Sequence, residues 1–137
     1  MPNYWIVKTE PSTYSFDDLA SQKRAVWDRV KNNLALKHLR RMKPADRVLV
    51  YHTGDEKAVV GVAEVVSEAY PDPKQKDPKL AVVDLRAVGR LPRPVPLAEI
   101  KQDRAFADLG LVRMGRLSVM PASADQFKRI LKLGGSK

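Results

Sequence analysis

The sequence contains no cysteine and only two histidines, His38 and His52. The lack of cysteine excludes a disulfide framework, a thiol nucleophile and a cysteine-ligated zinc site. Two histidines are too few for a histidine-rich metal site, and neither belongs to an H-E-x-x-H ligand set. We therefore expect neither a metal nor a cofactor.

Long apolar runs are also missing. No stretch approaches the roughly 18 residues that a membrane span needs. The first residues, MPNYWIVKTEP, lack the basic region and the long apolar segment of a secretory signal. The sequence predicts an intracellular protein, in the cytoplasm, nucleoid or nucleus, with no membrane partner.

The common enzymatic motifs are absent as well. The sequence has no G-x-x-x-x-G-K-[ST] phosphate loop, no G-x-G-x-x-G dinucleotide motif and no G-x-S-x-G nucleophile elbow. A pairing of His52 with Glu64 or Asp84 is conceivable, but their spacing does not single it out. We predict no catalytic residues and hence a protein that is not an enzyme.

What the chain does have is positive charge, a formal net charge of +9 over 137 residues. Such an excess in a small protein favours a polyanionic partner, usually nucleic acid. The alternative is charge spread over the surface for solubility. The basic residues gather at 23–24, 37–43, 86–93 and 128–132.

The length and the hydrophobic pattern predict one domain, residues 1–137, of mixed α+β class. We expect helices at 16–22, 34–42, 97–102 and 124–133, with Ser15, Asn33 and Ser123 as N-caps. Strands are expected at 3–8, 48–51, 59–66, 80–91 and 115–120. Residues 25–32 are predicted to be irregular and 69–78 a loop, and Pro92, Pro94 and Pro96 are predicted to end strand pairing.

The hairpin at 48–66 is the predicted centre of the fold. Both runs are apolar at neighbouring positions, so we expect central strands of a largely antiparallel sheet, with partial barrel closure to remove its edges. His52 and Thr53 follow the first strand, and Glu64 lies within the second. Polar groups in such a setting need partners or a ligand, so the hairpin is interpreted as a pocket wall.

Trp27 and Asn32 stand out in the predicted irregular segment. Trp5 is assigned to the core, whereas Trp27 lies among charged residues, where a flat ring can stack on a nucleobase. Asn32 has the donor and acceptor needed to read a base edge, although a helix or turn cap is an equal alternative. Arg116 and Ser118 share a face of the predicted last strand and are suited to a phosphate or a carbonyl oxygen.

Several segments, taken together and in order, resemble the EVE domain family. They are Tyr4-Trp5-Ile6-Val7-Lys8-Thr9-Glu10-Pro11, Trp27-x-x-Val30-x-Asn32, Leu39-Arg40-x-Met42-Lys43, Tyr51-His52-Thr53, Val60-Gly61-Val62-Ala63-Glu64-Val65, Tyr70-Pro71-Asp72-Pro73 and Arg116-Leu117-Ser118-Val119-x-Pro121. The resemblance implies a PUA-like small β-barrel flanked by short helices and related to the YTH readers of methylated RNA. It also implies a nucleic-acid-binding module with a pocket for one modified base.

The resemblance carries a set of site residues with it. The base-binding pocket would consist of Trp27, Val30, Asn32, Tyr51, His52 and Thr53. Phosphate or ligand contacts would come from Lys8, Arg29, Arg116 and Ser118. The chain departs from the family pattern at Arg29, where the family usually has Gly, and at Leu36, where it usually has Arg.

The leading hypothesis is therefore a non-catalytic reader. Its partner would be RNA or DNA with a methylated or hydroxymethylated base, held by stacking and edge hydrogen bonds. Two alternatives stay open. One is an enzyme that acts on a nucleoside or modified base with His52 as acid or base, and the other is a small-molecule or protein-binding PUA-like module.

Overall fold

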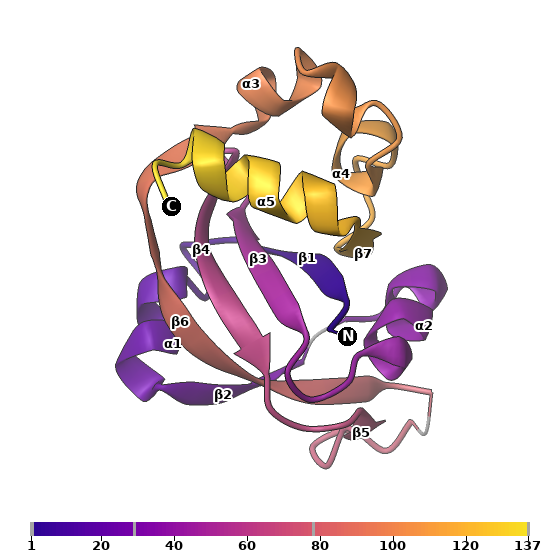
Figure 1. Cartoon of the computed structure of the whole chain (residues 1–137). Coiled ribbons are helices and arrows are strands. Elements are labelled where there is room, and N and C mark those ends of the chain that lie inside the picture. The colour runs from indigo at the N-terminus through magenta and orange to yellow at the C-terminus, as the bar shows by residue number, and fades with distance from the viewer. Residues whose placement is uncertain (1, 29, 78, 137) are drawn as a thin grey trace.

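The computed structural model of the chain describes residues 2–28, 30–77 and 79–136. Its strands are β1 (Tyr4–Thr9), β2 (Arg24–Trp27), β3 (Arg47–His52), β4 (Ala58–Val65), β5 (Tyr70–Pro71), β6 (Ala81–Pro96) and β7 (Val119–Ala122). Its helices are α1 (Phe16–Gln22), α2 (Asn33–Arg41), α3 (Leu97–Lys101), α4 (Gly110–Arg113) and α5 (Ala124–Leu133), with a 3₁₀ turn at Arg104–Phe106. Figure 1 shows α3, α4 and α5 gathered at one end of a curved sheet, with α1 and α2 nearer the other end.

The seven strands form one sheet in the order β2-β6-β4-β3-β1-β7, and β5 pairs with β6. β1 and β3 are parallel, whereas the other recorded pairs are antiparallel. This confirms the mixed α+β class and the largely antiparallel sheet. β2 and β7 are the two ends of the strand order, so the partial closure expected from the sequence corresponds to a curved sheet with these two strands at its limits.

The predicted central hairpin is confirmed as β3 and β4. Val48, Leu49, Val50, Val59 and Val60 have no exposed surface, because both faces of these strands are covered. Gly61 allows a side chain to pack closely against β4. A Cβ atom at this position would lie 2.6 Å from the ring of Phe16, so the ring packs directly against the backbone of β4.

Local capping signals explain where the helices begin. Ser15 and Ser123 are N-caps, as predicted, and each also forms a capping box, with Asp18 and Gln126 as the reciprocal partners. The prediction of Asn33 as the N-cap of α2 is wrong by one residue. Asn32 has the extended backbone of an N-cap, and its side-chain oxygen accepts a hydrogen bond of 3.0 Å from the amide of Ala35.

Two strand predictions need correction at β2 and β6. Residues 24–27 form an edge strand, β2, which pairs with β6 from Arg24↔Arg86 to Trp27↔Val83. β6 also continues through its prolines to Pro96, where it pairs with Ala58 of β4. The pairing of β6 with β2 stops at Arg86, so the later part of β6 is an edge on that side. An edge position tolerates proline, which has no amide donor.

The last strand is also displaced from its prediction. Residues 115–116 form a turn, and β7 begins only at Val119, where it pairs with Val7 of β1. The prediction that Arg116 and Ser118 alternate along a strand and share one of its faces is therefore wrong. The predicted loop at 69–78 is interrupted by the two-residue strand β5.

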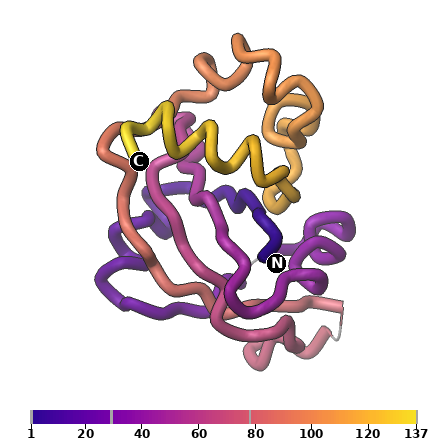
Figure 2. The backbone as a smooth tube through the Cα atoms, viewed as in Figure 1, coloured from indigo at the N-terminus to yellow at the C-terminus, as the bar shows by residue number. Residues whose placement is uncertain are grey.

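The C-terminal helix closes one side of the molecule. Its end returns to β6, as the tube in Figure 2 shows, and the carbonyl of Gly134 accepts a hydrogen bond of 3.0 Å from the amide of Arg93. In the part of the chain that the structure describes, no helix has both the length and the apolar character to cross a membrane.

Candidate functional site

A cavity of about 790 Å³ opens beside β2. One side is formed by the end of β1 and by Ser118, just before β7, and the other side by β2 itself. The cavity thus lies between strands from opposite ends of the sheet order. Its lining residues are Lys8, Thr9, Glu10, Thr13, Tyr14, Gln22, Arg24, Ala25, Val26, Trp27, Asp28, Val30, Lys74 and Ser118.

The apolar part of the wall is aromatic. Trp27 is only 6% exposed, yet it lines the cavity, and Val30 lies beside it with 7% exposure. The ring of Tyr14 meets the indole edge-on, with 6.1 Å between the ring centroids and 78° between the planes. Pairing of Trp27 with the buried Val83 of β6 fixes the backbone that carries the indole.

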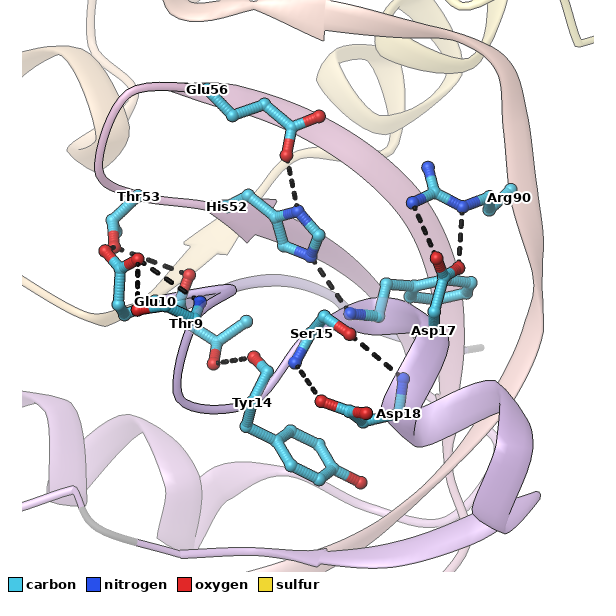
Figure 3. A network of polar contacts seen from close by, with 12 residues as sticks. Thr9, Glu10, Tyr14, Ser15, Asp17, Asp18, His52, Thr53, Glu56 and Arg90 are labelled. Atoms are coloured by element: carbon cyan, nitrogen blue, oxygen red, sulfur yellow. Dashed lines mark hydrogen bonds and ion pairs between the residues drawn. The ribbon is translucent and has the colours of Figure 1, made fainter.

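Tyr14 is positioned by the turn that leads from β1 into α1. The amides of Thr13 and Tyr14 both donate to the carbonyl of Glu10, each at 2.9 Å. The Thr9 hydroxyl donates to the carbonyl of Tyr14 at 2.6 Å (Figure 3). The Tyr14 hydroxyl donates to Gln22 at 2.5 Å. Burial, together with the negative charges of Asp18 and Asp28, raises the pKa of Tyr14, so the phenol is neutral near pH 7.

Among the residues that the structure describes, three cations border the cavity, and they differ in how they are held. Lys8 donates from Nζ to the carbonyl of Gly115 at 2.7 Å, and burial lowers its pKa. Arg24 is paired with Asp84 at 2.7 Å. Lys74 is exposed on the loop after β5, where its backbone amide donates to Asp72 at 2.9 Å. Lys74 is thus the cation with the most freedom to reach a ligand.

Glu10 adds a fixed hydrogen-bond acceptor to the cavity wall. Its carboxylate accepts from the amide and the hydroxyl of Ser12, and from the hydroxyl of Thr53 at 3.1 Å (Figure 3). The hydrogen bond from the Ser12 amide, followed by those from the Ser12 and Thr53 hydroxyls, lowers the pKa of Glu10, so the carboxylate is ionised at neutral pH.

The cavity brings together four of the ten residues predicted for the site, namely Trp27, Val30, Lys8 and Ser118. Thr53 does not line the cavity, but its hydroxyl donates a hydrogen bond to the lining residue Glu10. Asn32 caps α2 with its side-chain oxygen. Tyr51 is buried and has Lys8 Nζ 5.7 Å above its ring centroid. Arg116 is exposed in the turn before β7, and Arg29 lies outside the described residues.

His52 occupies a structural position. It is 2% exposed, its Nε2 accepts a hydrogen bond of 2.9 Å from the amide of Phe16, and its Nδ1 lies 2.7 Å from Glu56 (Figure 3). Because an acceptor Nε2 carries no proton, Nδ1 must be the donor to Glu56. Both ring nitrogens are therefore occupied. The two carboxylates considered as its partners, Glu64 and Asp84, bind Arg86 and Arg24 instead.

Sequence reasoning missed Tyr14, Glu10 and Lys74 as cavity residues. Tyr14 directly precedes Ser15, the N-cap of α1. Its position in the short connection between a strand and a capped helix was the signal in the sequence that could have identified it. Lys74 comes from a loop whose path the sequence does not determine. Among the described residues, no group of three or more His, Cys, Asp or Glu side chains is arranged to hold a metal ion.

Comparison with known proteins yields consistent matches. A family model, the EVE domain, matches residues 3–133. Mouse thymocyte nuclear protein 1 is 32% identical over 167 residues, which span 97% of this chain and 74% of that protein.

Two solved structures extend these matches to the fold. A protein of Rhodopseudomonas palustris is 39% identical, with a TM-score of 0.91 over 97% of this chain and 93% of its own. The human THYN1 protein, solved in complex with DNA that contains 5-methylcytosine, is 28% identical, with a TM-score of 0.89 over 98% of this chain and 99% of its own.

Proposed function

The chain belongs to the EVE domain family, and from this we propose that it is a single, non-catalytic domain that binds nucleic acid and holds one modified base in the cavity beside Trp27. One observation carries the proposal. A cavity walled by Trp27 and Tyr14 and bordered by Lys8, Arg24 and Lys74 combines a stacking surface with cations, in a chain whose net charge is +9. Its volume of about 790 Å³ is within the usual size of ligand sites, roughly 300–1,000 Å³.

Each wall of the cavity has a role in this proposal. Trp27 stacks on the base, and Val30 completes the apolar surface beneath it. Lys8 and Ser118 make polar contacts, and Lys74 binds a phosphate. Glu10 accepts a hydrogen bond from the base edge, and Thr53 positions Glu10. Asn32 supports the site as the cap of α2, while Tyr51 and His52 hold the adjoining strand and turn in place.

The module acts by binding alone, inside the cell. His52 is the strongest candidate for an acid or base, but its Nε2 already accepts from the amide of Phe16 and its Nδ1 is engaged by Glu56. Its 2% exposure also leaves no path to a substrate. These contacts favour a reader over an enzyme of nucleosides.

The choice of the first ligand follows from the human relative, which was solved with DNA that contains 5-methylcytosine. The test is fluorescence anisotropy with matched oligonucleotides that differ only in one base, carrying cytosine, 5-methylcytosine or 5-hydroxymethylcytosine, in DNA and in RNA. We expect tighter binding to at least one modified form. Equal affinity for every modified and plain oligonucleotide would overturn the modified-base proposal, and no binding at low salt would overturn nucleic-acid binding itself.

A further inference from the structure

Four consecutive residues, 113–116, are exposed where α4 ends and the chain turns toward β7. Met114, the C-cap of α4 and the first residue of the turn, is 46% exposed, which makes it one of the most exposed large apolar side chains among the described residues. The next residue is Gly115, where an added Cβ would meet no atom within 4 Å. The turn is therefore open to solvent at Gly115.

The turn is nevertheless fixed at its base. The amide of Met114 donates to the carbonyl of Gly110 at 2.7 Å, and the carbonyl of Met114 accepts from the amide of Leu117 at 2.9 Å. Leu117 is 5% exposed and anchors the turn in the core. The backbone that carries the exposed Met114 side chain is thus hydrogen-bonded through both its amide and its carbonyl.

The same turn adjoins the candidate base cavity. Lys8, which lines the cavity, donates from Nζ to the carbonyl of Gly115 at 2.7 Å. The amide of Lys8 also donates to the carbonyl of Ser118, another lining residue, at 2.9 Å. Met114 therefore precedes by one residue the point at which the turn is tied to the cavity wall.

Two cations lie on either side of Met114 along the chain. Arg113 and Arg116 are both exposed, and within the described parts of the chain neither takes part in a recorded ion pair. An exposed apolar side chain with an available guanidinium group on each side of it along the chain suits the alternation of stacked bases and phosphates along a nucleic-acid strand.

We propose that Met114 is a wedge that enters the base stack of a duplex where the base has moved into the cavity, while Arg113 and Arg116 bind the flanking phosphates. The proposal rests on the proposed function and deepens it, because it names double-stranded nucleic acid as the partner. A base inside a duplex must leave the stack to reach a protein pocket, and the gap is commonly filled by an apolar side chain such as Met. A flexible thioether also adapts to the irregular space between two base pairs.

The experiment compares one modified site in two contexts. Wild-type protein, Met114→Ala and the control Val88→Ala are titrated with a DNA duplex that contains one 5-methylcytosine and with the same strand alone. Val88 is equally exposed, at 47%, but does not line the cavity. Met114→Ala is expected to weaken duplex binding by roughly tenfold, since the wedge offsets part of the unstacking and unpairing cost, and to leave single-strand binding unchanged. Val88→Ala should change neither.

A second readout follows the base directly. A 2-aminopurine next to the modified base should brighten when wild-type protein binds the duplex, because the neighbouring stack is lost, and should brighten less with Met114→Ala. Met114→Leu, which keeps an apolar side chain, should restore both signals.

The outcomes separate the two proposals. If wild-type protein prefers the modified base in the single strand and Met114→Ala weakens both contexts equally or neither, the wedge is overturned and the reader stands. If wild-type protein prefers neither 5-methylcytosine nor 5-hydroxymethylcytosine over cytosine, in DNA or in RNA and in either context, the reader fails and the wedge with it.

Discussion

The indole Nε1 of Trp5 donates a hydrogen bond of 2.9 Å to Oδ2 of Asp46. Asp46 is 2% exposed and also accepts from the backbone amides of Asn3 and Lys43, at 2.9 and 3.0 Å. One carboxylate therefore joins the start of β1 to the turn between α2 and β3. The two tryptophans of the chain thus have separate environments, since Trp5 is held in this network and Trp27 lines the cavity.

Asp46→Asn should lower the free energy of unfolding. The two carboxylate oxygens accept three donors, and an amide has only one acceptor oxygen, so at least one of these buried or partly buried donors would lose its partner. The expected loss is about 1–3 kcal/mol for each group left unpaired. Urea denaturation followed by circular dichroism measures it. Asp55→Asn in the exposed β3–β4 loop is the control, and an equal change in both variants would contradict the prediction.

Trp27→Leu should reduce discrimination between modified and plain bases while leaving part of the nucleic-acid affinity intact. A base–aromatic stack contributes about 1–3 kcal/mol, so the preference should fall by at least several-fold. Trp5→Phe is the matched control, because it removes an indole that does not line the cavity. It should lower stability without changing the ratio of dissociation constants. A preserved ratio in Trp27→Leu would exclude this indole as the stacking surface.

Salt should weaken nucleic-acid binding steeply, and Lys74 should contribute one phosphate contact to this salt dependence. Each phosphate contact contributes a slope of about −0.7 to −0.9 in log K against log salt concentration. Lys74→Gln is expected to weaken all sequences alike and to reduce the slope by about one contact. Lys128→Gln, on α5 and away from the lining residues, is the comparison. Slopes that do not differ between the two variants would remove Lys74 from the interface.

Gly61→Ala should destabilise the fold, whereas Gly89→Ala should not. A Cβ at residue 61 would lie 2.6 Å from the Phe16 ring, but a Cβ at residue 89 meets no atom within 4 Å. Overpacking of this kind costs about 1–3 kcal/mol. Thermal unfolding of the two variants provides the measurement. If Phe16→Leu, introduced with Gly61→Ala, recovers no stability, the clash is not the cause.

Stability should fall in alkaline solution as Tyr70 ionises. Burial, the hydrogen bond of 2.6 Å to Asp84 and the charge of that carboxylate raise the pKa of Tyr70 to about 12. A folded-state pKa above the unfolded value of about 10 favours the neutral phenol in the native protein. This contribution is complete below pH 10 and is lost as the pH rises toward 12. Urea midpoints between pH 9 and 12 test it, and Tyr70→Phe should flatten the decline.

Local features of this fold were predictable from the sequence, and long-range ones were not. The capping boxes at Ser15 and Ser123 and the β3–β4 hairpin depend on residues close in the chain, so their signals are complete within a short window. β2 was missed because its partner, β6, begins more than 50 residues later and only that pairing makes it a strand. The position of β7 was misjudged for the same reason, since β1 selects its register.

The candidate site was predictable to a similar degree. Trp27, Val30, Lys8 and Ser118 were named in advance and line one cavity. Glu10 and Tyr14 were missed because a turn held by Thr9, and not a motif, brings them there. Pro92 and Pro94 were predicted to end strand pairing, but β6 continues to Pro96. The rule that proline interrupts a strand holds for strand interiors and does not apply at an edge.

The cavity lies between β2 and the β1–β7 edge, and some of the residues that line it do not belong to the hydrophobic core. Val26 and Thr13 line the cavity but are exposed, so their side chains can be exchanged without emptying the core or removing a β-ladder hydrogen bond. The domain is therefore a suitable scaffold for directed evolution, in which a library at these two positions could retune base preference at little risk to stability.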